Sequence, residues 1–396
     1  MQLDIADGID GILKIQVAVK SGLLSKLTVR STRPYQLTSI LKGRTTEEVL
    51  TMIPRLYASN SAAQSYAAVT AFESALGLST LDKSMVLRNL MVKSEILYEH
   101  LLRLLYDWPR ILGEPPFTEE IEKVQELLTQ FREAIDPKGL AFAFHQRGFE
   151  PDLPAARESL LQLEAILEAQ VFGLLPISWL SLPTTNLLGW IKKADVEGAK
   201  MIRALSGLGY SQLGQGKVAG LNWLTLKEIK EDLKFRPAEE YAQQPTLAGK
   251  IYETTPMSRM MGHRLMKDMK EQFGDGLFLR FLSRLVETAL CCNELKKDLE
   301  QPASSHLFGQ PRALATQGVS QIEAARGKLI HKVELVEQKV KSYNIIAPTD
   351  WNFHPKGILA QCLLGQTHVS EKATRQMIDV VIHALDPCVG FEVELS

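Results

Sequence analysis

Two short runs near the N-terminus alternate between apolar and polar or small residues. Every second residue over 13–19 is apolar, and the pattern repeats over 27–29 after the Ser21-Gly22 pair. A period of two is typical of a strand with one buried face, because successive side chains point to opposite faces. We therefore predict a β-hairpin within an N-terminal β-ribbon that covers residues 1–45.

Helical periodicity dominates the chain after this ribbon. Apolar residues recur every three or four positions, which is typical of amphipathic helices. The predicted helices cover residues 61–76, 82–106, 118–135 and 155–171. They form a helical bundle over residues 55–175, in which we expect Pro109 to end the second helix and Thr118 to cap the third.

The second half of the chain is less regular. Residues 176–254 are rich in glycine and polar residues and predict a loop-rich middle with short strands. Residues 255–396 return to helices, to a ribbon that turns at Glu337-Gln338, and to a last helix capped by Ser370. The pattern predicts a mainly α fold of the α+β class, a helical core with small β-ribbons, in a single domain over residues 1–396.

Composition narrows the class of protein. Of the 396 residues, 45% are hydrophobic and 23% are charged, and the formal net charge is −1. The composition excludes a chain that is disordered as a whole. The small net charge excludes a global electrostatic field that would attract nucleic acid or an anionic membrane. No apolar run reaches the length of a membrane span. The chain has only four cysteines, and the apolar stretch of a signal peptide does not follow its first residues. We therefore expect a cytoplasmic location.

Generic motifs give no reaction class. The sequence contains no Gly-x-x-x-x-Gly-Lys phosphate loop, no Cys-x-x-Cys and no His-Glu-x-x-His. His100 lies in a leucine-rich helix, where a structural role is favoured over a ligand role. Cys291, Cys292 and Cys362 are interpreted as packing residues, because free cysteine often serves as a small hydrophobe.

Five groups of residues carry a resemblance to a known family. They are residues 41–77, which contain Leu41-Lys42-Gly43-Arg44, residues 55–64 and Ala75-Leu76-Gly77; then residues 252–259; residues 322–327; residues 347–352; and residues 385–391. Together they resemble, in the same order, the motifs of the large subunit of [NiFe] hydrogenases. The resemblance spans nearly the whole chain and implies that family's architecture of β-ribbons and a helical core.

The departures from this family decide the expected chemistry. The family's four metal-binding cysteines fall on Tyr57, Asn60, Cys388 and Phe391. The family's histidine after the first pair falls on Gln64, and the basic residue that closes the last motif falls on Glu394. Tyrosine, asparagine and phenylalanine do not replace soft thiolates. We therefore expect no nickel, no complete Ni-Fe site and no enzymatic activity.

A hydrogenase scaffold that has lost most of its metal cysteines is similar to the accessory proteins of the HupK/HoxV type. This resemblance implies a maturation scaffold that holds an Fe(CN)2(CO) group or passes it to the hydrogenase large subunit. Its partners would be a small iron-carrier chaperone and the large-subunit precursor. Cys388 would anchor the iron, and Arg326, Pro348 and Asp386 would surround the group.

Other interpretations remain open at this stage. Cys388 could be an inert buried cysteine, Arg326 could pair with Glu323, and Trp351 and Asn352 favour a structural role. The chain could also be a quinone-pocket subunit of a related respiratory complex, or a metal-free decoy or chaperone. The retained Cys388 favours cofactor assembly.

The family motifs also make a geometric prediction. Residues 55–64 and 386–391 should meet in the core, with Tyr57 and Phe391 filling the space that thiolates and nickel occupy in the enzymes.

Overall fold

The computed structural model describes residues 11–80, 82–144, 150–216, 218–225, 227–234, 244–300, 312–314 and 317–396. The chain divides into two compact units. The first contains residues 1–79, 213–258 and 308–396, and the second contains residues 80–212 and 259–307. The chain passes from one unit to the other several times along the sequence. The single domain predicted for residues 1–396 stays a prediction.

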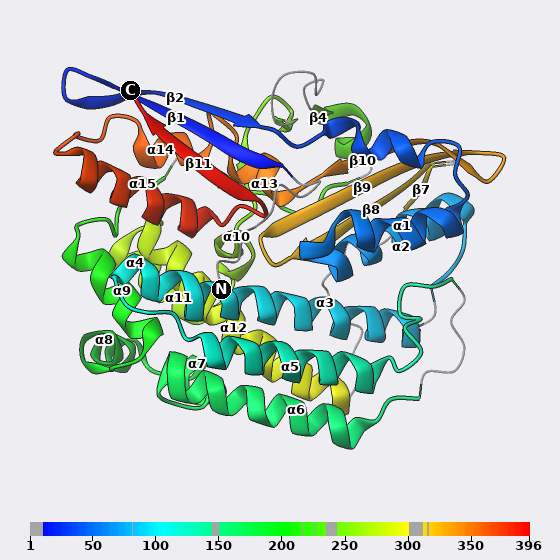
Figure 1. Cartoon of the computed structure of the whole chain (residues 1–396), viewed down its shortest axis with the longest axis horizontal. Coiled ribbons are helices and arrows are strands. Elements are labelled where there is room, and N and C mark those ends of the chain that lie inside the picture. Colours follow the sequence, from blue (N-terminus) through cyan, green and yellow to red (C-terminus); the bar gives the residue numbers. More distant parts are fainter. Residues whose placement is uncertain are drawn as a thin grey trace. The chain divides into compact units, whose positions relative to one another are not determined.

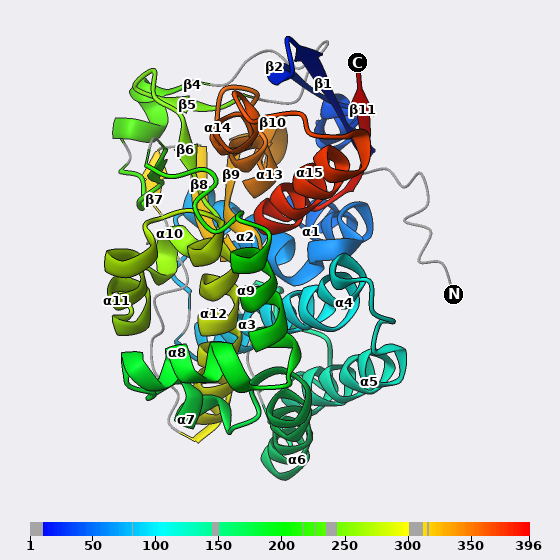
Figure 2. The ribbon, with the colours of Figure 1, turned by 90° about the vertical axis from the view of Figure 1, so that its left-hand side faces the viewer.

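The first unit has a small three-stranded sheet. β1 (Ile12–Lys20) and β2 (Leu23–Ser31) form the predicted antiparallel hairpin, and β11 (Gly390–Leu395) runs parallel to β1 on its other side (Figures 1 and 2). The alternating residues Leu13, Ile15 and Val17 are buried, as the period of two predicts. The sequence did not reveal β11, which pairs the two ends of the chain.

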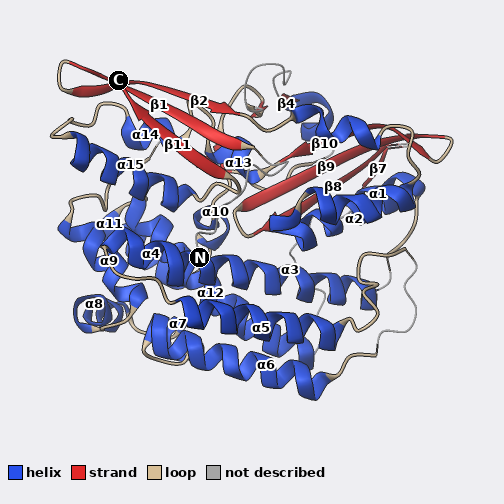
Figure 3. Ribbon diagram, in the orientation of Figure 1, coloured by secondary structure: helices blue, strands red, loops and turns tan. Residues whose placement is uncertain are grey.

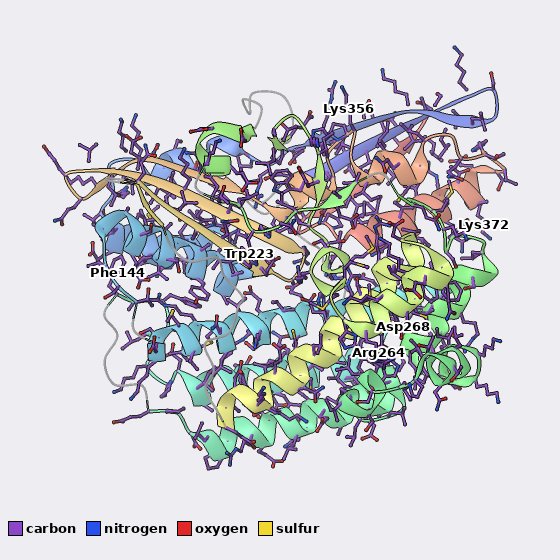
Figure 4. The ribbon with its side chains drawn as sticks, turned by 180° about the vertical axis from the view of Figure 1, so that it is seen from behind. Phe144, Trp223, Arg264, Asp268, Lys356 and Lys372 are labelled. Carbon is purple, nitrogen blue, oxygen red and sulfur yellow. The ribbon has the colours of Figure 1, made fainter. Side chains whose placement is uncertain are left out.

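A second sheet has the strand order β10-β9-β8-β7. Its strands are β7 (Arg312–Leu314), β8 (Gln317–Ala324), β9 (Gly327–Val336) and β10 (Lys339–Ile346). Glu337 and Gln338 form the predicted turn, with φ angles of 51° and 61°. On this sheet, Lys328 lies with its amine 4.2 Å from the ring centre of Trp223, a residue labelled in Figure 4.

Helix α2 (Ser61–Leu76) lies along β8 and β9 (Figure 3). The approach is close at Gly318, where an added Cβ would lie 1.8 Å from the carbonyl oxygen of Ala71. The Ser320 hydroxyl donates a hydrogen bond to the Ala67 carbonyl at 2.6 Å. Gly77 ends α2 in a left-handed conformation, with φ of 67°. The predicted helix over residues 61–76 is therefore confirmed.

The remaining elements of the first unit are short, apart from two helices. α1 covers Thr46–Leu56 and α15 covers Glu371–Leu385, and Ser370 caps α15 by accepting a hydrogen bond from the Ala373 amide, as predicted. The others are η1 (Tyr35–Leu41), η2 (Ala58–Asn60), β3 (Ala219–Gly220), η5 (Glu228–Asp232), β4 (Leu233–Lys234), β5 (Thr246–Leu247), β6 (Tyr252–Glu253), α13 (Pro348–Asn352) and α14 (Ile358–Leu363).

The described elements of the second unit are all helices, joined by loops. Its helices are α3 (Asp82–Leu102), η3 (Arg103–Asp107), α4 (Trp108–Leu112), α5 (Thr118–Ile135), α6 (Leu153–Ile166), η4 (Leu167–Phe172), α7 (Pro176–Leu180), α8 (Thr184–Lys193), α9 (Glu197–Gly207), α11 (Arg264–Phe273) and α12 (Leu277–Glu300). α10 (Pro256–Met260) spans the point in the sequence where the first unit gives way to the second. The mainly α fold with small β-ribbons is confirmed.

Three local predictions in this unit were wrong. Pro109 does not end its helix, because it occupies the first turn of α4, where a missing N–H costs nothing. The N-cap of α5 is Phe117, and Thr118 is its first helical residue. The first part of the predicted loop-rich segment 176–254 forms α7, α8 and α9, whose short lengths hide the helical period.

Buried charges join α12 to α3 within the second unit. Lys93 donates to Asp298 at 2.7 Å, and His100 lies 2.7 Å from Glu287, which Arg259 also contacts. Burial opposes ionisation of Glu287, but Arg259 and His100 outweigh it and lower its pKa to about 2. His100 therefore has the structural role that its surroundings predicted. Among the described residues, no helix is long and apolar enough to cross a membrane.

The approach of α2 to β8 makes a stability prediction. Gly318→Ala should lower the free energy of unfolding by about 3 kcal/mol or more, because backbone must shift to admit the methyl group. Gly189→Ala is the matched control, since Gly189 lies inside α8 with open space around its Cα. It should raise stability by up to about 1 kcal/mol, from helix propensity. Urea unfolding measures both changes, and equal effects would contradict the packing argument.

Candidate functional site

One cavity of the first unit collects most of the predicted site residues. The empty space in and in front of it, counted together with open solvent at its mouth, is about 370 Å³. Its lining consists of Arg33, Tyr57, Ser59, Asn60, Gln64, Ala324, Arg326, Leu329, Ala347, Pro348 and Cys388. Residues of the segment 55–64 therefore lie close to Cys388 in space although they are far from it in the sequence, as the family motifs predicted.

Arg326 connects three segments at this cavity. It follows β8, and its side chain is buried. Its Nε donates to Asp386 Oδ1 at 3.3 Å, and its Nη1 donates to Asn60 Oδ1 at 3.0 Å. Glu323, which the sequence offered as a partner of Arg326, forms an ion pair with Lys328 at 3.1 Å. Arg326 thus ties the β8–β9 turn to η2 and to the end of α15.

The backbone around Arg326 is fixed from behind. Asn352 donates through Nδ2 to the Arg326 carbonyl at 3.0 Å and accepts from the Thr254 amide at 2.8 Å. Gly327 has φ of +131°, and a Cβ there would lie 2.0 Å from the Thr254 carbonyl oxygen. Only glycine tolerates this conformation and this approach. The structural role predicted for Asn352 is to hold the Arg326-Gly327 turn in place.

Cys388 lies in the loop between α15 and β11. Asp386 ends α15 in the left-handed region, with φ of 53°, and turns the chain towards the cavity. The Thr349 hydroxyl donates to the Cys388 sulfur at 3.0 Å and accepts from the Cys388 amide at 3.2 Å. Cys388 is partly exposed, whereas Cys291, Cys292 and Cys362 are buried. The structure therefore gives Cys388 the access that a ligand role requires.

A smaller cavity adjoins the first and shares Arg33 and Cys388 with it. Leu13, Ser31, Thr349, Asp350 and Val389 complete its lining. Burial raises the pKa of Asp350 to about 6, against the charge of Arg33 and a hydrogen bond from the Ala347 amide. Cys388 thus lies where the two cavities adjoin.

The positions that align with the lost metal ligands separate into two groups. Tyr57, Asn60 and Gln64 line the larger cavity, and Gln64 Oε1 lies 2.9 Å from His331 Nε2. The other ring nitrogen of His331 lies 2.8 Å from the Tyr343 hydroxyl. Burial lowers the pKa of His331 to about 3, so this histidine stays neutral.

Phe391 and Glu394 belong to the second group. Phe391 lies on β11 opposite Leu13 and contacts the His383 ring at 5.8 Å between centroids. Glu394 accepts a hydrogen bond from Gln16 at 2.7 Å on the exposed part of the same sheet. Neither is among the residues that line the larger cavity, and the prediction that Phe391 fills the space of a lost thiolate and nickel stays a prediction.

Sequence reasoning missed several polar residues that line the two cavities. Thr349 and Asp350 lie inside a matched motif, so their positions offered a signal that was not used. Ser59 also lies within a matched stretch. Arg33 gave no signal, because it follows β2 in a segment without a matched motif.

The donor set limits what this site can hold. Among the residues that the structure describes, no three or more His, Cys, Asp or Glu side chains gather as a metal site. The larger cavity offers one thiol, amide and hydroxyl groups, and two guanidinium groups. Such a set does not match a metal that needs several thiolates. It matches a group that brings its own ligands and needs one thiolate and nearby hydrogen-bond donors.

Comparisons with known proteins define the class of fold. Residues 227–393 match the family model of the nickel-dependent hydrogenases. The Ni-Fe-Se hydrogenase from D. vulgaris Hildenborough in the reduced state superposes with a TM-score of 0.66 at 15% identity, over 93% of this chain and 94% of that one. The NAD+-reducing [NiFe]-hydrogenase gives 0.60 at 17% identity, over 93% of each chain. At these identities the likeness shows the fold alone, and that fold is hydrogenase large-subunit-like.

Relatives of similar length narrow the class further. The hydrogenase expression/formation protein HupV of Azotobacter chroococcum mcd 1 is 29% identical, over 97% of this chain and 98% of that protein. The hydrogenase expression/formation protein HoxV of Cupriavidus necator is 27% identical, over 92% and 91%. The predicted resemblance to hydrogenase accessory proteins of the HupK/HoxV type is confirmed. The names of these relatives support an accessory role in hydrogenase biogenesis.

The buried His331 makes a prediction about pH. Its folded-state pKa of about 3 lies below the usual value of 6.5, so below that usual value the unfolded chain binds a proton that the folded protein refuses. The free energy of unfolding should keep the full contribution of neutral His331 above pH 6.5. Below that pH it should fall by about 1.4 kcal/mol per pH unit. Urea unfolding at pH 7 and pH 5 measures this loss.

His331→Gln is the matched variant. This variant has no imidazole to protonate at position 331. Between pH 7 and pH 5, its free energy of unfolding should therefore fall by about 2 kcal/mol less than that of the unchanged protein. The other titrating groups are common to both proteins and cancel in the comparison. An identical pH dependence would show that His331 does not titrate as its burial requires.

Proposed function

We propose that this protein is a non-catalytic scaffold of [NiFe] hydrogenase maturation that holds an Fe(CN)2(CO) group and passes it to the hydrogenase large subunit. One observation carries the proposal. Cys388 is the single cysteine that lines the larger cavity, and it lies there together with the buried Arg326. The rest of the fold is similar to that of hydrogenase large subunits, which supports a role near hydrogenase assembly.

The iron group fits the chemistry of this cavity as a cargo. A cysteine thiolate is a soft donor suited to low-spin iron, and the cyanide and carbonyl ligands fill the other positions. Cyanide nitrogen accepts hydrogen bonds, and a guanidinium donates them in a fixed planar arrangement. The role of Arg326 is to bind and orient such ligands, and that of Pro348 is to give the cavity an apolar wall.

Release is as important to a scaffold as binding. A cargo held by one protein thiolate can leave when one bond is exchanged, whereas a cage of four thiolates would retain it. Hydrogen bonds from arginine add selectivity without adding a second covalent attachment. The proposed partners are a small iron-carrier chaperone and the large-subunit precursor, which is consistent with relatives that are named as hydrogenase expression/formation proteins.

Cys388→Ser tests the anchor. Serine keeps the size of the side chain but offers a harder, protonated donor, so the loading of iron should fall at least tenfold. Infrared spectra of protein purified anaerobically from cells that make the maturation machinery measure the cyanide and carbon monoxide bands. Cys362→Ser is the control, because Cys362 is buried in α14 away from the cavity. Bands of normal intensity in Cys388→Ser would show that the anchor lies elsewhere.

The absence of a thiolate cage predicts the metal content. The isolated protein should bind no nickel tightly and should neither oxidise nor produce hydrogen, because Tyr57 and Asn60 stand where the family has cysteines. Metal analysis after anaerobic dialysis against nickel, together with a hydrogen uptake assay, measures both properties. Stoichiometric nickel with hydrogen turnover would overturn the non-catalytic assignment.

A further inference from the structure

A second guanidinium reaches the cavity besides that of Arg326. Arg33 lines both the larger cavity and the adjoining one, on either side of Cys388. It lies outside the segments that resemble the hydrogenase motifs, and no step of the proposed function uses it. Its position between the two cavities raises the question of what its charge does there.

The backbone of Arg33 lies close to that of Gly11. Gly11 has φ of +66°, and a Cβ there would lie 2.5 Å from the Arg33 nitrogen and 2.7 Å from its Cα. The Arg33 amide also donates to the Ser31 hydroxyl at 3.1 Å. Glycine at position 11 permits this approach, so the point from which the Arg33 side chain leaves the backbone is fixed.

The side chain of Arg33 extends over a position that has lost its thiolate. Its guanidinium carbon lies 5.5 Å from the centre of the Tyr57 ring, within the range of a cation–π interaction. Tyr57 is buried and aligns with the first of the family's metal-binding cysteines. A protein cation and an aromatic ring therefore lie together at a position that aligns with a metal-binding cysteine of the family.

The charged side chains on the lining of the larger cavity are both positive. Arg33 and Arg326 line it, and its lining contains no Asp or Glu. The carboxylates near these two groups lie outside this lining: Asp386 pairs with Arg326, and Asp350, which interacts electrostatically with Arg33, lines the adjoining cavity. Fixed positive charge in a partly buried site attracts anions and repels divalent cations.

We propose that Arg33 determines the specificity of this cavity, since its charge, held over Tyr57, selects small anions and anionic metal–cyanide complexes and repels free divalent metal ions from Cys388. The cargo in this statement rests on the proposed function. The preference for anions belongs to the empty protein and is tested without cargo.

Two alkylating reagents of similar size but different charge test the preference. Iodoacetate is an anion, iodoacetamide is neutral, and both react with the same thiolate. The ratio of their rates therefore cancels the fraction of thiolate present and reports the local potential. Cys388 is the partly exposed cysteine, so peptide mass spectrometry follows its alkylation separately from that of the buried cysteines.

In the folded protein, the iodoacetate to iodoacetamide ratio at Cys388 should exceed the ratio in urea-unfolded protein by about threefold or more. Arg33→Met should return the ratio towards the unfolded value, and Arg33→Lys should keep part of the preference. Arg44→Met is the control, because Arg44 is exposed and paired with Glu48 at 3.4 Å outside the cavity. A folded ratio no higher than the unfolded one, or one that Arg33→Met leaves unchanged, would overturn the proposal.

Thiocyanate is a second probe that needs no reaction at the thiol. Its binding, followed by its infrared stretching band, should be at least threefold weaker in Arg33→Met than in Arg44→Met. The infrared bands of purified cargo separate this proposal from the proposed function. A retained iodoacetate preference without cyanide bands refutes only the scaffold role, whereas cyanide bands without the preference refute only the role of Arg33.

Discussion

The buried contact of Arg326 with Asp386 and Asn60 is the interaction on which the cavity of the first unit depends. The side chain of Arg326 is 5% exposed and that of Asp386 is 2% exposed, so each charge is stable there only because it is paired. The contact joins the β8–β9 turn, the end of α15 and η2, three segments that no local pattern brings together. The Cys388 loop follows Asp386 directly, so the position of the thiol follows from this ion pair.

The sequence revealed those elements that have one buried and one exposed face. The β1–β2 hairpin, α5 and α15 each show a clear period, because water contacts one face and the core contacts the other. β8 is buried along nearly its whole length, since α2 covers it, and it therefore shows no alternation. β11 depends on pairing with a strand at the opposite end of the chain, which no local window contains.

The same distinction applies to the site. The matched motifs correctly placed Asn60, Arg326 and Cys388 around one cavity, because these residues lie close to the anchoring contact. They do not specify the position of Phe391, which is set by the register between β11 and β1. Arg33 reaches the cavity through the packing of Gly11 on its backbone, a contact that follows from the fold and not from spacing.

The residues at the former ligand positions have acquired roles of their own. The Asn60 amide accepts from Arg326 and donates to the Ser59 hydroxyl at 3.2 Å, and Gln64 is bonded to the buried His331. Moving these side chains aside for a metal would leave buried polar groups without partners, at about 1–3 kcal/mol each. The cavity is therefore not an enzyme site with ligands deleted. The amides of Asn60 and Gln64 are committed to the protein, which leaves Cys388 as the one soft donor of the lining and favours a cargo that arrives with its own ligands.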